Sequence, residues 1–190
     1  MHGYFRSCGN IEFVYSVGLI FAGVTDWIRK RKMEKKYGNG IVTADEISRM
    51  DLHSVELVVI SACWSSRNQI IEDKGYHGLI GAFSEAGVHY VISHLWSADD
   101  FSSIILMDHF YYQYTQRKLA PPAALNLAKK YLRKITIRQM RKEGWFDCIL
   151  QSDLDMESKA YVQKYEKMDD MLCPFENEIY WGGFSCYRCN

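Results

Sequence analysis

The segment that decides the fold is residues 55–63, VELVVISAC. Residues 55–61 are almost continuously apolar and rich in β-branched side chains, which is typical of a central parallel strand covered on both faces. The segment ends at Ala62 and Cys63. Since chemistry in open α/β sheets gathers at the carboxyl ends of the strands, Cys63 is placed where a rigidly supported nucleophile is expected.

Strands and helices alternate outward from this segment. A short buried strand is expected before it, and a helix that stops at Gly87 and a further β-branched strand are expected after it. The pattern predicts strands at 16–24, 88–94 and 179–187, and helices at 79–86, 101–114 and from Pro121 to about 134. This order is the signature of an α/β fold.

Three further segments complete the predicted organisation. Thr43 stands three residues before Glu46, a capping-box pattern that predicts a helix at 44–50 after a short extended segment. Residues 65–75 are predicted to be a polar loop. Residues 136–177 are polar and acidic, and we interpret them as an insertion with a helical tendency. The chain is therefore predicted to form a single domain over residues 1–190.

Composition narrows the classes of function. The chain has 190 residues, of which 48% are hydrophobic, enough for one domain with a core. Its 23 basic and 23 acidic residues cancel, so no net field attracts nucleic acid or anionic lipid.

The basic run at 29–36 is interpreted as a solvated loop, with a nuclear-targeting or nucleic-acid patch as the alternative. The longest apolar stretch, 13–24, is too short to span a membrane, and no signal peptide is recognised at the start, so a cytoplasmic protein is expected.

The six cysteines do not form a dense disulfide framework, which favours a reduced compartment. Cys186 and Cys189 have CxxC spacing. A zinc site would need a second pair, and Cys148 with Cys173 make a poor one, so structural or free thiols are the preferred interpretation and no metal is predicted.

A nucleophilic cysteine needs a base that removes its proton. Two histidines are the leading candidates by position. His2 precedes Gly3, where a backbone N–H can approach a bound carbonyl, and His94 ends the strand that follows Cys63. By themselves these features also fit a buried structural cysteine and an ordinary His-Gly turn.

Segments of the chain resemble the motifs of a known family and occur in the same order. The chain resembles CHAT domains, which are caspase-like cysteine peptidase modules often found beside tetratricopeptide repeats. Segments similar to the family's motifs follow one another in the family's order: 2–5 (HGYF), 16–23 (SVGLIFAG), 40–48 (GIVTADEIS), 55–63 (VELVVISAC), 78–87 (GLIGAFSEAG), 91–100 (VISHLWSADD), 107–111 (MDHFY), 123–125 (AAL) and 180–184 (YWGGF).

The resemblance implies a cysteine endopeptidase with a His–Cys dyad. His2 would be the general base and Cys63 the nucleophile, and the backbone N–H groups of Gly3 and Cys63 would form the oxyanion hole. The implied fold is a caspase-like three-layer sandwich with a mostly parallel central sheet. No metal or cofactor is implied. The implied partners are a protein or peptide substrate and tetratricopeptide repeats upstream in a longer chain, with neither nucleic acid nor membrane.

The chain also departs from the family pattern. Trp64-Ser65-Ser66 stands where the family usually has Glu-Thr-Gly after the cysteine. The sequence begins at the proposed base, so the domain looks truncated at its N-terminus and is expected to lack its first strands, to hold His2 without a strand and to have little activity. The alternatives are a non-catalytic CHAT-like scaffold for protein interactions and an unrelated α/β domain with a structural cysteine.

Substrate preference is the last expectation. Trp96, Asp99 and Asp100 follow the strand after the cysteine. In the related separase-type peptidases, an acidic residue just after a similar Leu-Trp segment binds a basic side chain before the scissile bond. Asp100 is the closer match and Asp99 the next, and a carboxylate there would favour arginine through a bidentate pair. The alternative is that these aspartates cap the helix at 101–114.

Overall fold

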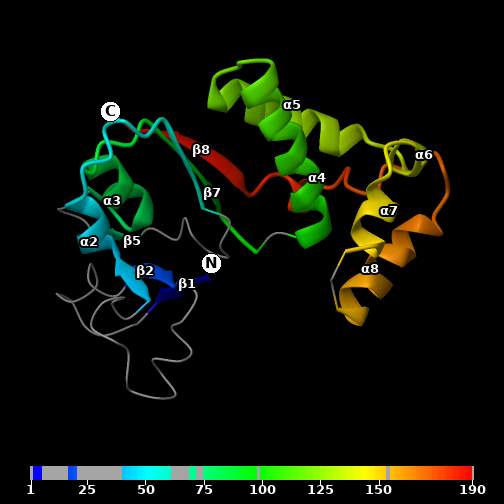
Figure 1. The fold of residues 1–190 in the computed structure, drawn as a ribbon, viewed down its shortest axis with the longest axis horizontal. Coiled ribbons are helices and arrows are strands. Elements are labelled where there is room, and N and C mark those ends of the chain that lie inside the picture. The colour runs from blue at the N-terminus through cyan, green and yellow to red at the C-terminus, as the bar shows by residue number, and fades with distance from the viewer. Residues whose placement is uncertain are drawn as a thin grey trace. The chain divides into compact units, whose positions relative to one another are not determined.

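The computed structural model describes residues 2–5, 17–20, 40–60, 69–71, 75–97, 99–152 and 155–189. The chain divides into two compact units (Figure 1). Unit 1 consists of Met1–Ser97 together with Phe184–Asn190, and unit 2 consists of Ala98–Gly183. Unit 1 therefore contains all the described strands, and unit 2 is built from helices.

The central sheet of unit 1 has the strand order β4-β7-β8, with β4 at Leu57–Val59, β7 at Tyr90–His94 and β8 at Phe184–Arg188. β4 and β7 are parallel, with Val58 opposite Val91. β8 is antiparallel to β7, with Phe184 opposite His94. The last four residues of β7 are all buried, as expected for a strand that has neighbours on both edges and is covered on both faces.

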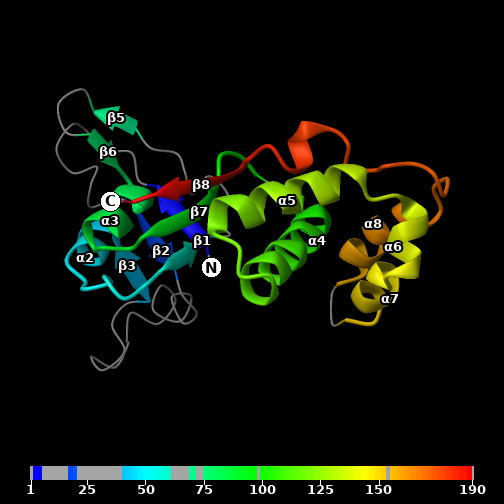
Figure 2. The ribbon, with the colours of Figure 1, turned by 90° about the horizontal axis from the view of Figure 1, so that it is seen from above.

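Two smaller antiparallel sheets complete the strands of unit 1. One has the order β1-β2-β3, formed by His2–Phe5, Val17–Ile20 and Ile41–Thr43. The other is a hairpin of β5 (Gln69–Ile71) and β6 (Gly75–His77), visible at the upper left of Figure 2. This hairpin overlaps the segment at 65–75 that was predicted to be a polar loop, so that prediction is wrong for residues 69–71 and for Gly75. Ile70 and Ile71 are β-branched residues of β5, and only three residues separate β5 from its partner strand β6.

Helices α2 (Ala44–Ser48) and α3 (Leu79–Glu85) pack against each other beside these sheets. The predicted capping box is confirmed: the Thr43 hydroxyl accepts from the Glu46 backbone N–H, and the Glu46 carboxylate accepts from the Thr43 backbone N–H at 2.8 Å. Just past α3, Gly87 has a φ of +94°, a conformation that glycine adopts without strain. Ile47, Leu79 and Val91 are among the buried residues of the core between these elements.

Unit 2 begins with α4 (Asp100–Tyr111), which continues as a π-helical turn at Tyr112–Gln116, and α5 (Pro121–Lys134) packs along α4 (Figure 2). The predicted proline start of α5 is confirmed. The segment predicted to be an insertion contains three short helices: α6 (Ile137–Lys142), α7 (Trp145–Leu150) and α8 (Met156–Glu166). A 3-10 turn at Glu178–Tyr180 leads back toward β8.

A cluster of aromatic rings joins α4, α8 and the segment after α8 in unit 2. Phe175 is fully buried and contacts the rings of Phe101, Tyr165 and Tyr180 at centroid distances between 5.2 and 5.8 Å. Aromatic pairs of this kind stabilise by about 0.5–1.5 kcal/mol beyond the area that they bury. The cluster thus ties α4, α8 and the chain after α8 into one core.

The predicted α/β class is confirmed. A mostly parallel sheet is not: within the described residues β4 and β7 pair in parallel, whereas the pairs β1–β2, β2–β3, β5–β6 and β7–β8 are antiparallel. The predicted closing strand exists, but it starts at Phe184, because residues 178–180 form the 3-10 turn.

Candidate active site

His2 and Gly3 lie in a strand. β1 pairs with β2 along all four of its residues, with His2 opposite Ile20 and Gly3 opposite Leu19. Leu19 is 5% exposed and belongs to the core cluster of unit 1. The expectation that His2 would have no strand to hold it is therefore wrong. This strand was not predictable from the sequence, because four residues are too few to show a strand period.

The described strands lead to the edge where Cys63 is expected. A hydrogen bond of 2.8 Å from the Ile60 N–H to the Ile92 carbonyl extends the pairing of β4 with β7 beyond Val59. Because the two strands are parallel, their carboxyl ends meet at the same edge of the sheet. Cys63 lies outside the described residues, and its place at this edge stays a prediction from its position three residues after Ile60.

Two polar side chains of β7 are buried at this same edge. His94 is 5% exposed, and its ring meets that of Phe184 at a centroid distance of 3.7 Å in an edge-on arrangement. Ser93 is fully buried, and its hydroxyl has no hydrogen-bond partner among the described residues. The packing of His94 on Phe184 accounts for a histidine in this strand without a catalytic role. Trp96 follows two residues after the strand, in unit 1, and is half-buried.

Asp99 and Asp100 belong to unit 2 and differ sharply in their contacts. Asp99 is the N-cap of α4: its Oδ1 accepts from the Ser102 N–H at 2.8 Å, and its Oδ2 accepts from the Tyr161 hydroxyl at 2.6 Å. Burial and this bond to Asp99 raise the pKa of Tyr161 to about 12. The capping alternative is thus confirmed for Asp99. Asp100 is exposed and has no hydrogen bond or ion pair with another described residue.

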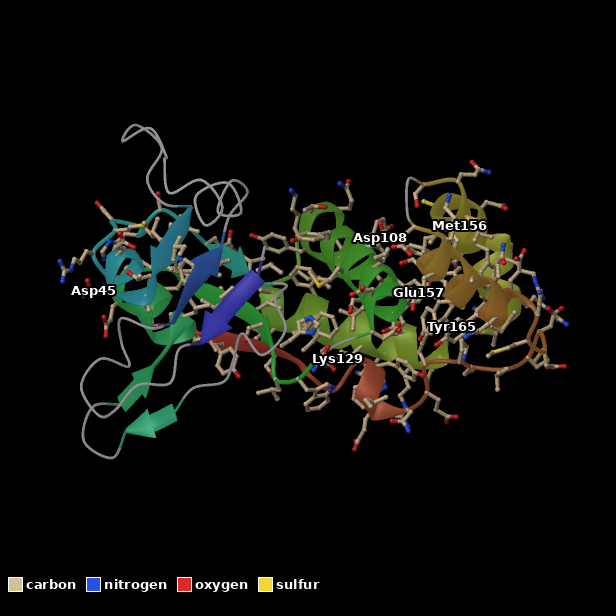
Figure 3. All side chains as sticks on the ribbon, turned by 90° about the horizontal axis from the view of Figure 1, so that it is seen from below. Asp45, Asp108, Lys129, Met156, Glu157 and Tyr165 are labelled. Atoms are coloured by element: carbon tan, nitrogen blue, oxygen red, sulfur yellow. The ribbon has the colours of Figure 1, made fainter. Side chains whose placement is uncertain are left out.

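Asp100 lines a cavity of about 400 Å³ between α4 and α8, which we call the acidic pocket. Glu157 lies on the side of α8 that faces α4 (Figure 3). Three carboxylates contribute to the lining, and Lys164 is the one basic residue among the described lining residues. The remaining walls are largely apolar, with Phe101, Ile104 and Tyr161 among them. A cavity with this lining suits a side chain that has an apolar stem and a cationic end.

A second cavity in unit 2, of about 470 Å³, was not predicted; we call it the aromatic pocket. It is lined by residues from the end of α4, the π-helical turn, α5, the C-terminal cap of α6 and the start of α7: Asp108, His109, Tyr111, Tyr112, Thr115, Gln116, Tyr131, Glu143 and Trp145. These residues are scattered over 38 positions of the chain, counted from 108 to 145, and no local motif joins them. Only the packing of the helices brings them together.

The described residues contain no group of three or more His, Cys, Asp or Glu side chains that could hold a metal ion. Cys189, the second residue of the CxxC pair, is buried, and this burial raises the pKa of its thiol. In the part of the chain that the structure describes, no helix has both the length and the apolar character needed to cross a bilayer.

The chain belongs to the CHAT domain family, whose profile matches residues 2–188. The match spans both units, from β1 to β8. Neither a curated protein nor a solved structure shows significant similarity to the chain. Family membership relates the chain to caspase-like peptidases.

Proposed function

We propose that this chain forms the catalytic part of a cysteine endopeptidase. The observation that carries the proposal is the CHAT family match together with the strand placement: His2 and Gly3 are fixed in β1, and β4 leads toward Cys63. The partner is a protein or peptide substrate. A reducing cytoplasm is the compartment that suits a free catalytic thiol.

The reaction would proceed in two steps that need no cofactor. His2 takes the thiol proton of Cys63, and the thiolate attacks the peptide carbonyl carbon while the N–H groups of Gly3 and Cys63 stabilise the oxyanion. His2 then gives the proton to the leaving amine, and the peptide bond breaks to leave a thioester on Cys63. Water activated by His2 hydrolyses the thioester, which releases the new carboxylate and restores the thiol.

The substrate residue before the cleaved bond is proposed to be basic. Asp100 supplies a carboxylate that no described residue pairs with, and Glu157 adds a second on the facing helix. Asp99 is a weaker candidate for this role because both of its oxygens are engaged, by Ser102 and Tyr161. Trp96 remains a proposed apolar contact for the substrate.

The test is the reactivity of Cys63 in the protein with all its cysteines. A limiting amount of an iodoacetamide probe near pH 7 should modify Cys63 first, because His2 maintains a thiolate fraction that an ordinary thiol with a pKa near 8.5 does not have. Cys63→Ala should remove both this labelling and any peptidase activity, and His2→Gln should slow the labelling. Cys148→Ala, which removes an exposed thiol, is the matched control. Peptide cleavage that persists in Cys63→Ala would refute the proposal.

One observation favours a second function. Trp64-Ser65-Ser66 differs from the family's usual Glu-Thr-Gly directly after the cysteine, next to the proposed oxyanion hole. A CHAT-like scaffold that binds proteins without cleaving them is the alternative. The same labelling experiment separates the two functions, since a scaffold would leave Cys63 no more reactive than Cys148.

A further inference from the structure

Most of the residues that line the aromatic pocket carry aromatic rings. The His109 ring stacks on Tyr131 with centroids 4.1 Å apart and planes 3° from parallel, which fixes α4 against α5. Tyr111 and Tyr112, at the junction of α4 and the π-helical turn, are 44% and 50% exposed. Large exposed aromatic side chains around a cavity are typical of a binding surface, because they leave apolar area in contact with water.

The pocket also carries negative charge that the described residues do not balance. Asp108, which Figure 3 labels, and Glu143 line it. None of the described lining residues is Lys or Arg, and neither carboxylate forms an ion pair with a described residue. Glu143 accepts hydrogen bonds from the hydroxyl of Tyr131 and from the indole N–H of Trp145. These donors are neutral, so they orient the carboxylate without cancelling its charge.

His109 does not supply the missing cation. Burial lowers its pKa, and this effect outweighs the opposing influence of Asp108 and Glu143. The ring is therefore neutral at pH 7. One of its nitrogens lies 3.1 Å from the side-chain amide nitrogen of Gln113, an arrangement in which the neutral ring accepts a hydrogen bond from the amide.

The aromatic rings and carboxylates of the pocket together favour one kind of cation as its ligand. A metal ion needs several ligands close together, and the described residues offer no such group. A guanidinium group is planar and weakly hydrated, stacks on aromatic faces and pairs with carboxylates through its flat edge. An ammonium is more strongly hydrated and gains less from leaving water for such a pocket.

We propose that the aromatic pocket is a binding site for a guanidinium group, held by the aromatic rings of Tyr112, Tyr131 and Trp145 and the carboxylates of Asp108 and Glu143. The group would come from an arginine side chain of a bound protein or from a free guanidinium compound. The site lies apart from the acidic pocket in its residues, and the proposal does not depend on peptidase activity.

The indole N–H of Trp145 provides a direct probe, because it donates to Glu143 inside the pocket. Protein labelled with ¹⁵N at tryptophan, carrying Cys63→Ala to prevent turnover, is titrated with N-acetyl-arginine methylamide. Its neutral isostere, N-acetyl-citrulline methylamide, is the matched ligand. The Trp145 resonance is assigned by its absence in Trp145→Phe.

The arginine amide should shift the Trp145 resonance saturably, and the citrulline amide should not. Asp108→Asn and Glu143→Gln should each weaken binding by about fivefold, the size of a partly exposed charge contact. Asp100→Asn, in the acidic pocket, should leave the affinity unchanged. Asp108 is exposed, so its substitution preserves the fold, and unchanged melting temperatures of the variants check this.

A second arm of the titration identifies the source of the cation. Methylguanidinium alone is compared with the arginine amide and with a short arginine peptide. Affinity that increases along this series identifies a protein side chain, and equal affinity identifies a free compound. The absence of a saturable shift, equal binding of citrulline, or weakening by Asp100→Asn but not by Asp108→Asn would overturn the proposal.

Discussion

Neighbouring aspartates at the start of α4 have unequal roles, and substitution separates them. Asp99→Ala removes the cap on Ser102 and the acceptor for Tyr161, so it should destabilise the protein by about 1–2 kcal/mol. Asp99→Asn retains an acceptor oxygen and should cost less. Asp100→Asn should leave stability nearly unchanged, since Asp100 is exposed, and should instead reduce the preference for arginine before the cleaved bond.

Urea unfolding and a peptide-library cleavage profile measure these two effects. The substitution at Asp100 serves as the control for stability, because it leaves the cap formed by Asp99 intact. A profile that does not change in Asp100→Asn, or strong cleavage after acidic or apolar residues, would leave helix capping as the function of this acidic pair.

At the scale of elements, the stack of His109 on Tyr131 makes the contact between α4 and α5 sensitive to pH. Burial lowers the pKa of folded His109 below its ordinary value of 6.5, despite the nearby carboxylates of Asp108 and Glu143. The unfolded chain then binds more protons than the folded one in mild acid. Stability from this residue is fully present above about pH 6.5 and is lost as the pH falls through the lowered pKa.

His109→Phe keeps a ring for the stack and removes the titrating group. The free energy of unfolding, measured in urea at pH 7 and pH 5, should therefore fall less between these pH values in the variant than in the unsubstituted protein. The same pH dependence in both proteins would show that His109 is not the residue responsible.

Elements whose signals are local could be predicted from the sequence. Thr43 and Glu46 cap the start of α2, Pro121 begins α5, and Gly87 ends the turn after α3. Each of these residues determines the conformation of the few residues next to it in the sequence. The strand before Cys63 was also predictable, because burial on both faces leaves a continuous apolar run. Its described part, Leu57–Val59, is shorter than the predicted 55–61.

Elements that depend on distant partners were not predictable. β1 is a strand because β2 pairs with it, and the hairpin of β5 and β6 forms in a segment whose composition is that of a loop. The aromatic pocket is the strongest case at the site level. His109 meets Tyr131 only because α4 and α5 pack side by side, and two residues on separate helices, 22 positions apart, share no local sequence pattern.

At the scale of the molecule, the division into two compact units predicts separate local stabilities. Phe175→Ala opens the aromatic core of unit 2 and should cost about 3–5 kcal/mol, whereas Ile47→Ala should cost about 2–5 kcal/mol in the core of unit 1. Hydrogen exchange read by mass spectrometry should show faster exchange mainly in α4–α8 for the first variant and mainly in α2, α3 and β7 for the second. Equal acceleration across the whole chain in either variant would indicate one cooperative unit.

The pairing of β7 with β8 has a consequence for biosynthesis. All of unit 2 is made between these two strands, so at roughly 5–20 residues per second β7 waits on the order of ten seconds for its neighbour. Throughout that interval one edge of β7 offers unpaired backbone groups beside apolar side chains, the combination that promotes association between nascent chains. If translation stops within unit 2, the released fragment would contain β7 without β8 and would be prone to aggregate. Chaperone binding would therefore matter most at that stage of translation.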